Sequence, residues 1–179
     1  MASNRHLARL IAIQTLYEWS FLSERFPIVE REKLTTVREL TEEGRAKVEE
    51  ILERNFKEFE KSLNNRDFLF DLVWGTLENQ LNIDKIVAPA APEWPIDQIA
   101  LVDLVVLRLA IYELLFKREV PPKVAINEAV ELAKSLGGPN SSKFVNGVLG
   151  TVYRASEIYN PEDDNRPSKK EQKKDNKDN

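Results

Sequence analysis

The side chains of this chain that could carry acid–base chemistry are few and far apart. Among its 179 residues there is one histidine, His6, and no cysteine, so the sequence offers no thiolate nucleophile, thiolate metal site or disulfide. Glu128 and Glu131 share one side of a predicted helix, but that side is otherwise polar, and we interpret them as solvated carboxylates. The chain also lacks a glycine-rich phosphate loop. These observations predict a binding protein and not an enzyme, with no cofactor and no metal ion.

Residues suited to phosphate binding stand near the N-terminus. Arg5 and Arg9 are four positions apart, so a helix places both guanidiniums on one face, with His6 nearby. A guanidinium can bind phosphate through two hydrogen bonds and can stack on a base. From the residues alone a solvated pair is the commoner case, and both interpretations stay open.

The charge balance limits how the chain could bind a nucleic acid. It has 26 Lys and Arg against 30 Asp and Glu, a formal net charge of −4. A protein that binds nucleic acid through a general electrostatic field is normally basic. Any RNA contact here must therefore be local, or shared with a basic partner.

Hydrophobic periodicity predicts an all-α fold of two packed helical subdomains, with about three and about four helices. The expected organisation is an N-terminal subdomain (residues 1–87), a proline-rich connector (88–95), a C-terminal bundle (96–160) and a charged, disordered tail (161–179). Helices in this first part of the chain are expected over residues 5–22, 28–42, 43–63 and from 67 to about 87. The last of these is expected to bury Leu69, Val73, Leu77, Leu81 and Ile86.

A long central helix is expected over residues 96–116. Its charged residues Asp103, Arg108 and Glu113 stand five positions apart, so successive side chains differ in direction by about 140°. They cannot form one polar face, and each must reach a gap between helices or find its own partner. Charges in the most apolar segment argue against a membrane span, and the absence of cysteine suits a reducing cytoplasm.

The segment from Lys123 to Gly150 predicts two helices joined by a sharp corner. Gly137 and Gly138 follow the last apolar position of the first helix, where we expect a left-handed C-cap. Pro139 prevents continuation, and Asn140, Ser141 or Ser142 can cap the second helix. The N-terminus of that second helix could bind an anion. Within it, Gly147 and Gly150 are expected to allow close helix packing, with Asn146 hydrogen-bonded inside.

Three parts of the chain carry a family resemblance. The residues KVAINEAVELAK and KFVNGVLG of the hairpin resemble the C-terminal signature of the NusB family of bacterial transcription antitermination factors. The N-terminal helix fits the pattern R-x-x-A-R-x-x-A-x-Q-x-L-Y-x-W of the same family through Arg5, Ala8, Arg9, Ala12, Gln14, Leu16, Tyr17 and Trp19. The central residues 107–114 match as well, so the resemblance covers roughly residues 4–157.

The resemblance implies a function and a set of site residues. Family members bind the boxA element of nascent ribosomal RNA transcripts together with the ribosomal protein NusE, as part of the transcription elongation complex. The RNA-binding positions that it implies are Arg5, His6, Arg9, Asn140, Lys143 and Phe144. Tyr17 and Asp103 are the implied contacts with the protein partner. On this interpretation, alanine at both arginines weakens RNA binding and leaves helicity intact.

The chain departs from the family pattern at several of these positions. Leu7 stands where another arginine is common, and Asn140 stands where aspartate is common. Ser142 replaces a frequent histidine, and Asp103 is one methylene shorter than the usual glutamate. Fewer fixed positive charges predict weaker RNA binding by the chain alone. Two alternatives stay open: a NusB-like module that regulates an RNA methyltransferase in trans, and a helical interaction module without RNA binding.

Overall fold

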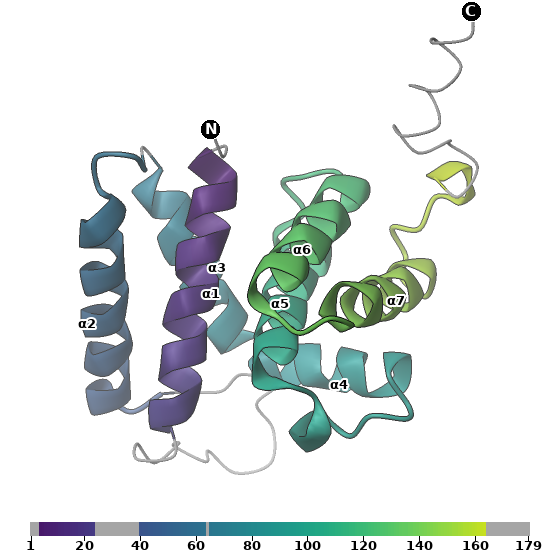
Figure 1. Ribbon diagram of the computed structural model, residues 1–179, viewed down its shortest axis with the longest axis horizontal. Coiled ribbons are helices and arrows are strands. Elements are labelled where there is room, and N and C mark those ends of the chain that lie inside the picture. The colour runs from purple at the N-terminus through teal and green to yellow at the C-terminus, as the bar shows by residue number, and fades with distance from the viewer. Residues whose placement is uncertain (1–3, 24–39, 64, 164–179) are drawn as a thin grey trace, which may run out of the picture.

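The computed structural model describes residues 4–23, 40–63 and 65–163, and their regular elements are all helical (Figure 1). This confirms the predicted all-α fold. The α-helices are α1 (Asn4–Leu22), α2 (Glu42–Phe59), α3 (Arg66–Glu78), α4 (Gln80–Ala90), α5 (Leu101–Ile111), α6 (Pro122–Leu136) and α7 (Ser141–Arg154). The predicted helix over residues 28–42 lies almost wholly outside the described residues.

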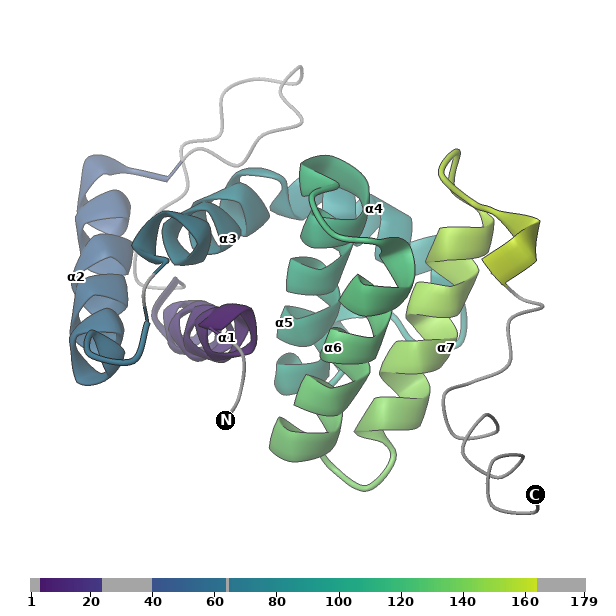
Figure 2. The same ribbon diagram turned by 90° about the horizontal axis from the view of Figure 1, so that it is seen from above.

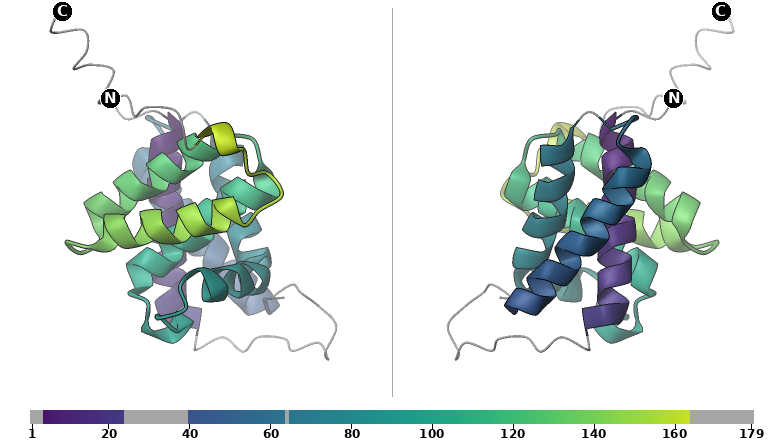
Figure 3. Two further views of the ribbon diagram at one scale, coloured as in Figure 1. Left: turned by 90° about the vertical axis from the view of Figure 1, so that its right-hand side faces the viewer. Right: turned by 90° about the vertical axis from the view of Figure 1, so that its left-hand side faces the viewer.

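Helix α5 lies in the middle of the molecule, between two groups of helices. On one side α1 packs against α5, and α2 and α3 pack against α1 (Figure 2). On the other side α6 and α7 lie side by side, and α4 crosses beneath α7 (Figures 1 and 3). The apolar character of nearly every face of α5 follows from this position, because its neighbours surround it. Among its fully buried side chains are Leu107 and Ile111.

The predicted helix from residue 67 to 87 is in fact two helices. It breaks at Asn79, whose side-chain amide donates to the carbonyl of Gly75 at 2.8 Å and whose backbone N–H also bonds to that carbonyl. The amide thereby satisfies a free carbonyl at the end of α3 and lets the chain turn. The turn changes which residues face the core, so Leu81, predicted to be buried, is 41% exposed.

Helix α4 enters the segment that was predicted to be a connector. It continues to Ala90 with Pro89 in its last turn. Because α4 packs on α5 and α7, it sits with the C-terminal helices, and a subdomain boundary at residue 87 stays a prediction. The predicted helix over residues 96–116 also begins later. A short 3₁₀ turn, Ile96–Gln98, is followed by extended backbone at Ile99 and Ala100 before α5 starts.

The end of the central helix widens into a π-helical turn, Tyr112–Lys117. This turn ends at Arg118, which has a left-handed backbone with φ of 54°, and the Arg118 N–H bonds to the carbonyl of Glu113 at 2.9 Å. Such a conformation is unusual for a residue other than glycine. The π turn places Glu113 where it can reach α1.

The corner between α6 and α7 forms as predicted, but not by the predicted backbone conformation. Gly137 has an extended backbone with φ of −97°, and no glycine in the described ranges has a positive φ. Glycine is required there for space, because a Cβ would overlap the Ser141 hydroxyl and would lie 2.8 Å from the Ala133 carbonyl oxygen. The Ser141 hydroxyl instead accepts a hydrogen bond from Gly138 N–H at 2.9 Å.

The prediction of close packing along α7 is wrong. A Cβ at Gly147 would meet nothing within 4 Å, and one at Gly150 would meet only the side chain of Arg154. Asn146 is exposed. This face of α7 points to solvent because Val145, Val148, Leu149 and Val152 turn the opposite face to the core.

The first three residues of the predicted disordered tail have regular structure. Pro161–Asp163 form a 3₁₀ turn, and the Tyr153 hydroxyl donates to the Asp163 carboxylate at 2.6 Å. The rest of the predicted tail, residues 164–179, lies outside the described part. Over the ranges that the structure does describe, none of the helices is both long and apolar enough to cross a membrane.

Candidate nucleic-acid interface

The most deeply buried charge among the predicted site residues belongs to Arg9. Its Nε donates to Glu113 Oε2 at 2.7 Å and its Nη2 donates to Glu113 Oε1 at 2.9 Å. The two side chains are 3% and 2% exposed. This two-bond geometry is the strongest form of an arginine–carboxylate pair. Arg9 is therefore not an exposed phosphate ligand, and the prediction that it forms one accessible face with Arg5 is wrong.

Glu128 links this ion pair to His6. The Glu128 Oε2 atom lies 2.9 Å from His6 Nδ1 and accepts from Arg9 Nη1 at 3.4 Å. Glu128 extends from α6 towards α1 and is half-buried there. The interpretation of Glu128 as a solvated carboxylate is therefore wrong. Sequence reasoning missed the link because the partners are 119 to 122 positions apart. His6 is held near the surface by this contact.

Arg5 remains at the surface near the N-terminus of α1. It is exposed, and none of the described carboxylates forms an ion pair with it. Its guanidinium carbon lies 5.3 Å from the centre of the Phe68 ring, and that of Arg9 lies 5.6 Å from the same ring. A cation over an aromatic face is attracted to it. The Phe68 ring therefore orients the Arg5 guanidinium. The hydrogen-bond donors of Arg5 stay available.

Lys117 also approaches the Phe68 ring, with its Nζ 5.4 Å from the ring centre. It is paired with Asp71 and lies 3.0 Å from Glu119. Burial lowers the pKa of Lys117, but the hydrogen bonds to Asp71 and Glu119 outweigh burial, and the net pKa is raised. The positive charge of Lys117 is thus balanced by these two carboxylates, so among the cations at the Phe68 ring Lys117 is not available for a phosphate.

The second predicted RNA-binding region is the start of α7. Asn140 and Lys143 are exposed, and the Asn140 side chain makes no capping hydrogen bond to the helix. Phe144 is half-buried and meets Trp94 edge to face, with ring centres 6.4 Å apart. Trp94 is 51% exposed and was not predicted as a site residue. Its position among three prolines suggested only a connector.

A pocket of about 390 Å³ opens at this corner. Its lining includes Trp94, Gln98, Asp103, Asn140 and Phe144. Asp103 is 7% exposed, and its Oδ1 atom is buried without a hydrogen-bond partner in the described part of the chain. The structure therefore places Asp103, predicted to face the protein partner, together with the predicted RNA-binding residues.

Tyr17 lies at a different surface. It is 38% exposed and meets Phe21 edge to face at 5.1 Å, and Phe21 is 62% exposed. Tyr17 lines a second pocket, of about 610 Å³, together with Val102 and Leu136. Leu136, the last apolar residue of α6, is 41% exposed here. Tyr17, Phe21 and Leu136 give this surface exposed apolar side chains beside Gln14 and Glu18, and protein interfaces are often apolar at their centre.

These residues belong to a chain whose relatives are known. Residues 6–154 match the NusB family. The chain belongs to the NusB family. The transcription antitermination protein NusB of Chloroflexus aggregans is 40% identical over 154 residues, covering 85% of this chain and 88% of the relative. NusB of Roseiflexus castenholzii is 39% identical, covering 85% and 93%.

Solved NusB structures share the fold. NusB of T. maritima superposes with a TM-score of 0.67 at 29% identity, covering 91% of this chain and 97% of that one. A chain from the crystal structure of antitermination factors NusB and NusE in complex with dsRNA gives a TM-score of 0.66 at 25% identity, covering 87% and 100%. All predicted site positions except Arg5 fall inside the span that matches the NusB family.

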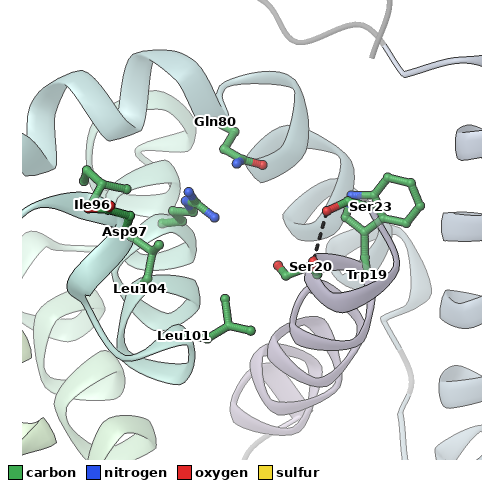
Figure 4. A pocket seen from close by; sticks show the side chains of 9 residues that line it. Trp19, Ser20, Ser23, Gln80, Ile96, Asp97, Leu101 and Leu104 are labelled. Atoms are coloured by element: carbon green, nitrogen blue, oxygen red, sulfur yellow. Dashed lines mark hydrogen bonds between the residues drawn. The ribbon is translucent and has the colours of Figure 1, made fainter. Parts of the chain in front are cut away.

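A further pocket, of about 430 Å³, lies between the end of α1 and the start of α5 (Figure 4). Trp19, Ser20 and Gln80 line it, and the Ser23 hydroxyl donates to the Ser20 carbonyl at 3.0 Å. Arg108 also lines this pocket, but its Nε and Nη2 donate to Asp84 at 2.8 and 2.9 Å. Its charge is therefore already paired, which agrees with the expectation that each charge of the central helix reaches a gap or finds its own partner.

Proposed function

We propose that this protein is a transcription antitermination factor that binds boxA-type RNA together with the ribosomal protein NusE. One observation carries the proposal: the fold matches, over 87% of this chain, a chain from the crystal structure of NusB and NusE in complex with dsRNA. On this proposal the protein acts in the cytoplasm by assembly within the transcription elongation complex, and not by catalysis.

We assign the RNA surface to two exposed places joined by α6. The first is Arg5 with His6 at the start of α1, and the second is Asn140, Lys143 and Phe144 at the start of α7. From Glu128, which contacts His6, to Leu136 at the end of α6 there are eight positions, or about 12 Å along the helix. One RNA strand can span that distance. Arg9 serves this surface indirectly, because its bonds to Glu113 and Glu128 fix α1 against α6.

We assign the protein partner to the surface of Tyr17, Phe21 and Leu136. Tyrosine and phenylalanine that are exposed together are typical anchors of protein interfaces. The net charge of −4 favours a basic partner, because opposite charges speed encounter and lower repulsion of RNA from the complex. NusE would then supply positive charge that the chain itself lacks.

The test is a titration of labelled boxA RNA with the protein alone and with NusE, each at two salt concentrations. We expect weak binding by the protein alone and much tighter binding with NusE, since few cations of the chain reach the RNA. The salt dependence should also be steeper in the presence of NusE. Equal affinity with and without NusE would reject the shared surface.

A matched pair of variants locates the RNA surface. Arg5→Ala should weaken RNA binding in the presence of NusE, because it removes an exposed guanidinium at the proposed site. Arg45→Ala is the control: its side chain is 54% exposed but lies on α2, away from both proposed contact places. Equal losses in both variants would indicate a general charge effect and not a local site.

A further inference from the structure

Glu128 is a half-buried carboxylate directly beside the proposed RNA surface. Its side chain is 29% exposed, and its Oε2 atom lies 2.9 Å from His6 Nδ1 and 3.4 Å from Arg9 Nη1. The Arg9 guanidinium makes its two shorter bonds, of 2.7 and 2.9 Å, to Glu113. The charge of Arg9 is therefore balanced mainly by Glu113, and the nearest partner of Glu128 is the His6 ring.

This contact fixes which ring nitrogen of His6 carries a hydrogen. An ionised carboxylate only accepts hydrogen bonds, so the Nδ1 atom that faces Glu128 must carry the hydrogen. In the neutral imidazole the other nitrogen, Nε2, is then an acceptor, and it gains a hydrogen only when the ring is protonated. A phosphate oxygen is itself an acceptor. His6 can therefore donate to a phosphate through Nε2 only as an imidazolium.

The charges around His6 favour this imidazolium. Within the described ranges, charged side chains at this end of α1 come from three helical elements: Arg5 and Arg9 on α1, Glu113 and Lys117 in the π-helical turn, and Glu128 on α6. At the centre of this group the guanidinium of Arg9 faces two carboxylates, so a neutral His6 leaves one negative charge uncompensated. Arg5 opposes a second cation beside it, but Arg5 is exposed and its field is screened by water. Lys117 is already balanced by carboxylates of its own.

We propose that His6 binds an RNA phosphate as an imidazolium, and that Glu128 is the positioning residue that orients the ring and balances its charge. The His6 side chain is 30% exposed, so a phosphate can reach it. A phosphate on one side and Glu128 on the other place the ring between two anions, which favours its protonated form. RNA binding is therefore accompanied by the uptake of a proton. The inference rests on the proposed function, because it says how one residue of the RNA surface becomes a cation.

The experiment measures the affinity of boxA RNA for the full chain, with NusE present, from about pH 6 to about pH 8 and at several salt concentrations. Histidine is the side chain that ordinarily titrates in this range, and His6 is the only histidine of the chain. We expect the affinity to fall roughly tenfold over this range, since one proton changes an equilibrium by at most about tenfold per pH unit. The dependence of log affinity on log salt should also become shallower by about 0.7 at the higher pH, because one phosphate contact is lost.

Two substitutions of His6 provide the limits for comparison. His6→Arg carries its charge at every pH, so its affinity should stay near the wild-type value at about pH 6. His6→Gln is always neutral, and its affinity should stay near the wild-type value at about pH 8. Any pH dependence that both variants retain comes from NusE or from other groups. A wild-type profile parallel to that of His6→Gln would overturn the proposal.

Glu128→Gln tests the positioning residue. It keeps an acceptor for the ring and removes the charge, so the fall in affinity should move to lower pH, a change that a merely structural role would not produce. Glu131→Gln is the matched control, because it removes the same charge from an exposed position one turn further along α6. Circular dichroism and urea unfolding check that both variants are folded. Coinciding pH profiles of the two variants would reject Glu128 as the positioning residue.

A spectroscopic measurement on the wild type needs no substitution. Because the chain has one histidine, the NMR signals of its imidazole can be assigned without ambiguity when this chain alone is labelled. At about pH 7, addition of boxA RNA in the presence of NusE should shift these signals towards their positions at low pH. If the RNA binds and the signals do not shift in that direction, His6 takes up no proton and the proposal fails.

The outcomes also separate this inference from the function on which it rests. If boxA RNA binds with NusE and the affinity of the wild type does not change with pH, this inference fails while the proposed function stands. If boxA RNA does not bind in the presence of NusE at any pH, the proposed function fails, and with it this inference.

Discussion

Arg9 on α1 and Glu113 in the π-helical turn form a two-bond ion pair inside the protein, with N···O distances of 2.7 and 2.9 Å. They are 104 positions apart in the chain. The pair joins the N-terminal helix to the end of the central helix, and Glu128 extends it to α6. A charge pair buried to this degree stabilises the fold only while both members are present.

Removing Arg9 should destabilise the protein strongly. Arg9→Met leaves Glu113 buried without its partner, and we expect the free energy of unfolding in urea to fall by about 3–5 kcal/mol. A variant with alanine at both Arg5 and Arg9 should therefore also lose stability, contrary to the expectation from the sequence that its helicity stays intact. Arg5→Ala is the control, and its effect should stay within about 0.5 kcal/mol because Arg5 is exposed. Similar small losses in both variants would contradict the buried pair.

Two glycines should respond to alanine in opposite directions. A Cβ at Gly75 would overlap the Tyr112 ring, which is 8% exposed and cannot move without losing its hydrogen bond to Asp71. Gly75→Ala should lower the free energy of unfolding by roughly 1–3 kcal/mol. A Cβ at Gly147 meets nothing, so Gly147→Ala should raise it by about 0.5–1 kcal/mol. Urea unfolding of both variants gives the comparison, and a loss at Gly147 would mean that α7 is packed there.

Tyr112 should make stability depend on alkaline pH. Burial, together with the nearby Asp71 carboxylate, raises the pKa of Tyr112 from 10.0 to about 12. The folded state therefore holds this proton more tightly than the unfolded state, and the contribution is present in full below pH 10. It is lost as the pH rises from about 10 through about 12. Denaturant unfolding at a series of pH values should show a steeper loss for the wild type than for Tyr112→Phe. Parallel curves would contradict the shift, and tyrosinate absorbance offers a direct check.

Asp103→Asn should stabilise the protein in the absence of RNA. The substitution removes charge from a buried side chain that has an unpartnered oxygen, and we expect a gain of roughly 1 kcal/mol. Thermal unfolding of the free protein measures it, with Asp97→Asn as an exposed control that should change little. A lower melting temperature for Asp103→Asn would show that this oxygen has a donor after all.

Local sequence signals determined the helical fold class and the family, but not every helix boundary. Apolar residues at helical spacing placed α6, and the steric limits of proline and glycine placed the corner after it, because these effects act within a few residues. The pattern from Arg5 to Trp19 and the hairpin residues were sufficient to indicate the NusB family. Such signals could not say why Gly137 is needed, since the crowding atoms of Ser141 depend on how the corner closes.

Only the tertiary structure decided which similar residues have different roles. Arg5 and Arg9 are the same residue type one helical turn apart, yet Arg9 is buried because Glu113 and Glu128 approach it from other helices. Gly75 and Gly147 look alike in sequence, but only Gly75 faces a ring. Trp94, Asp103 and Phe144 come from separate segments and meet in one pocket. Burial and partnership arise from contacts between distant segments, and spacing along one helix carries no information about them.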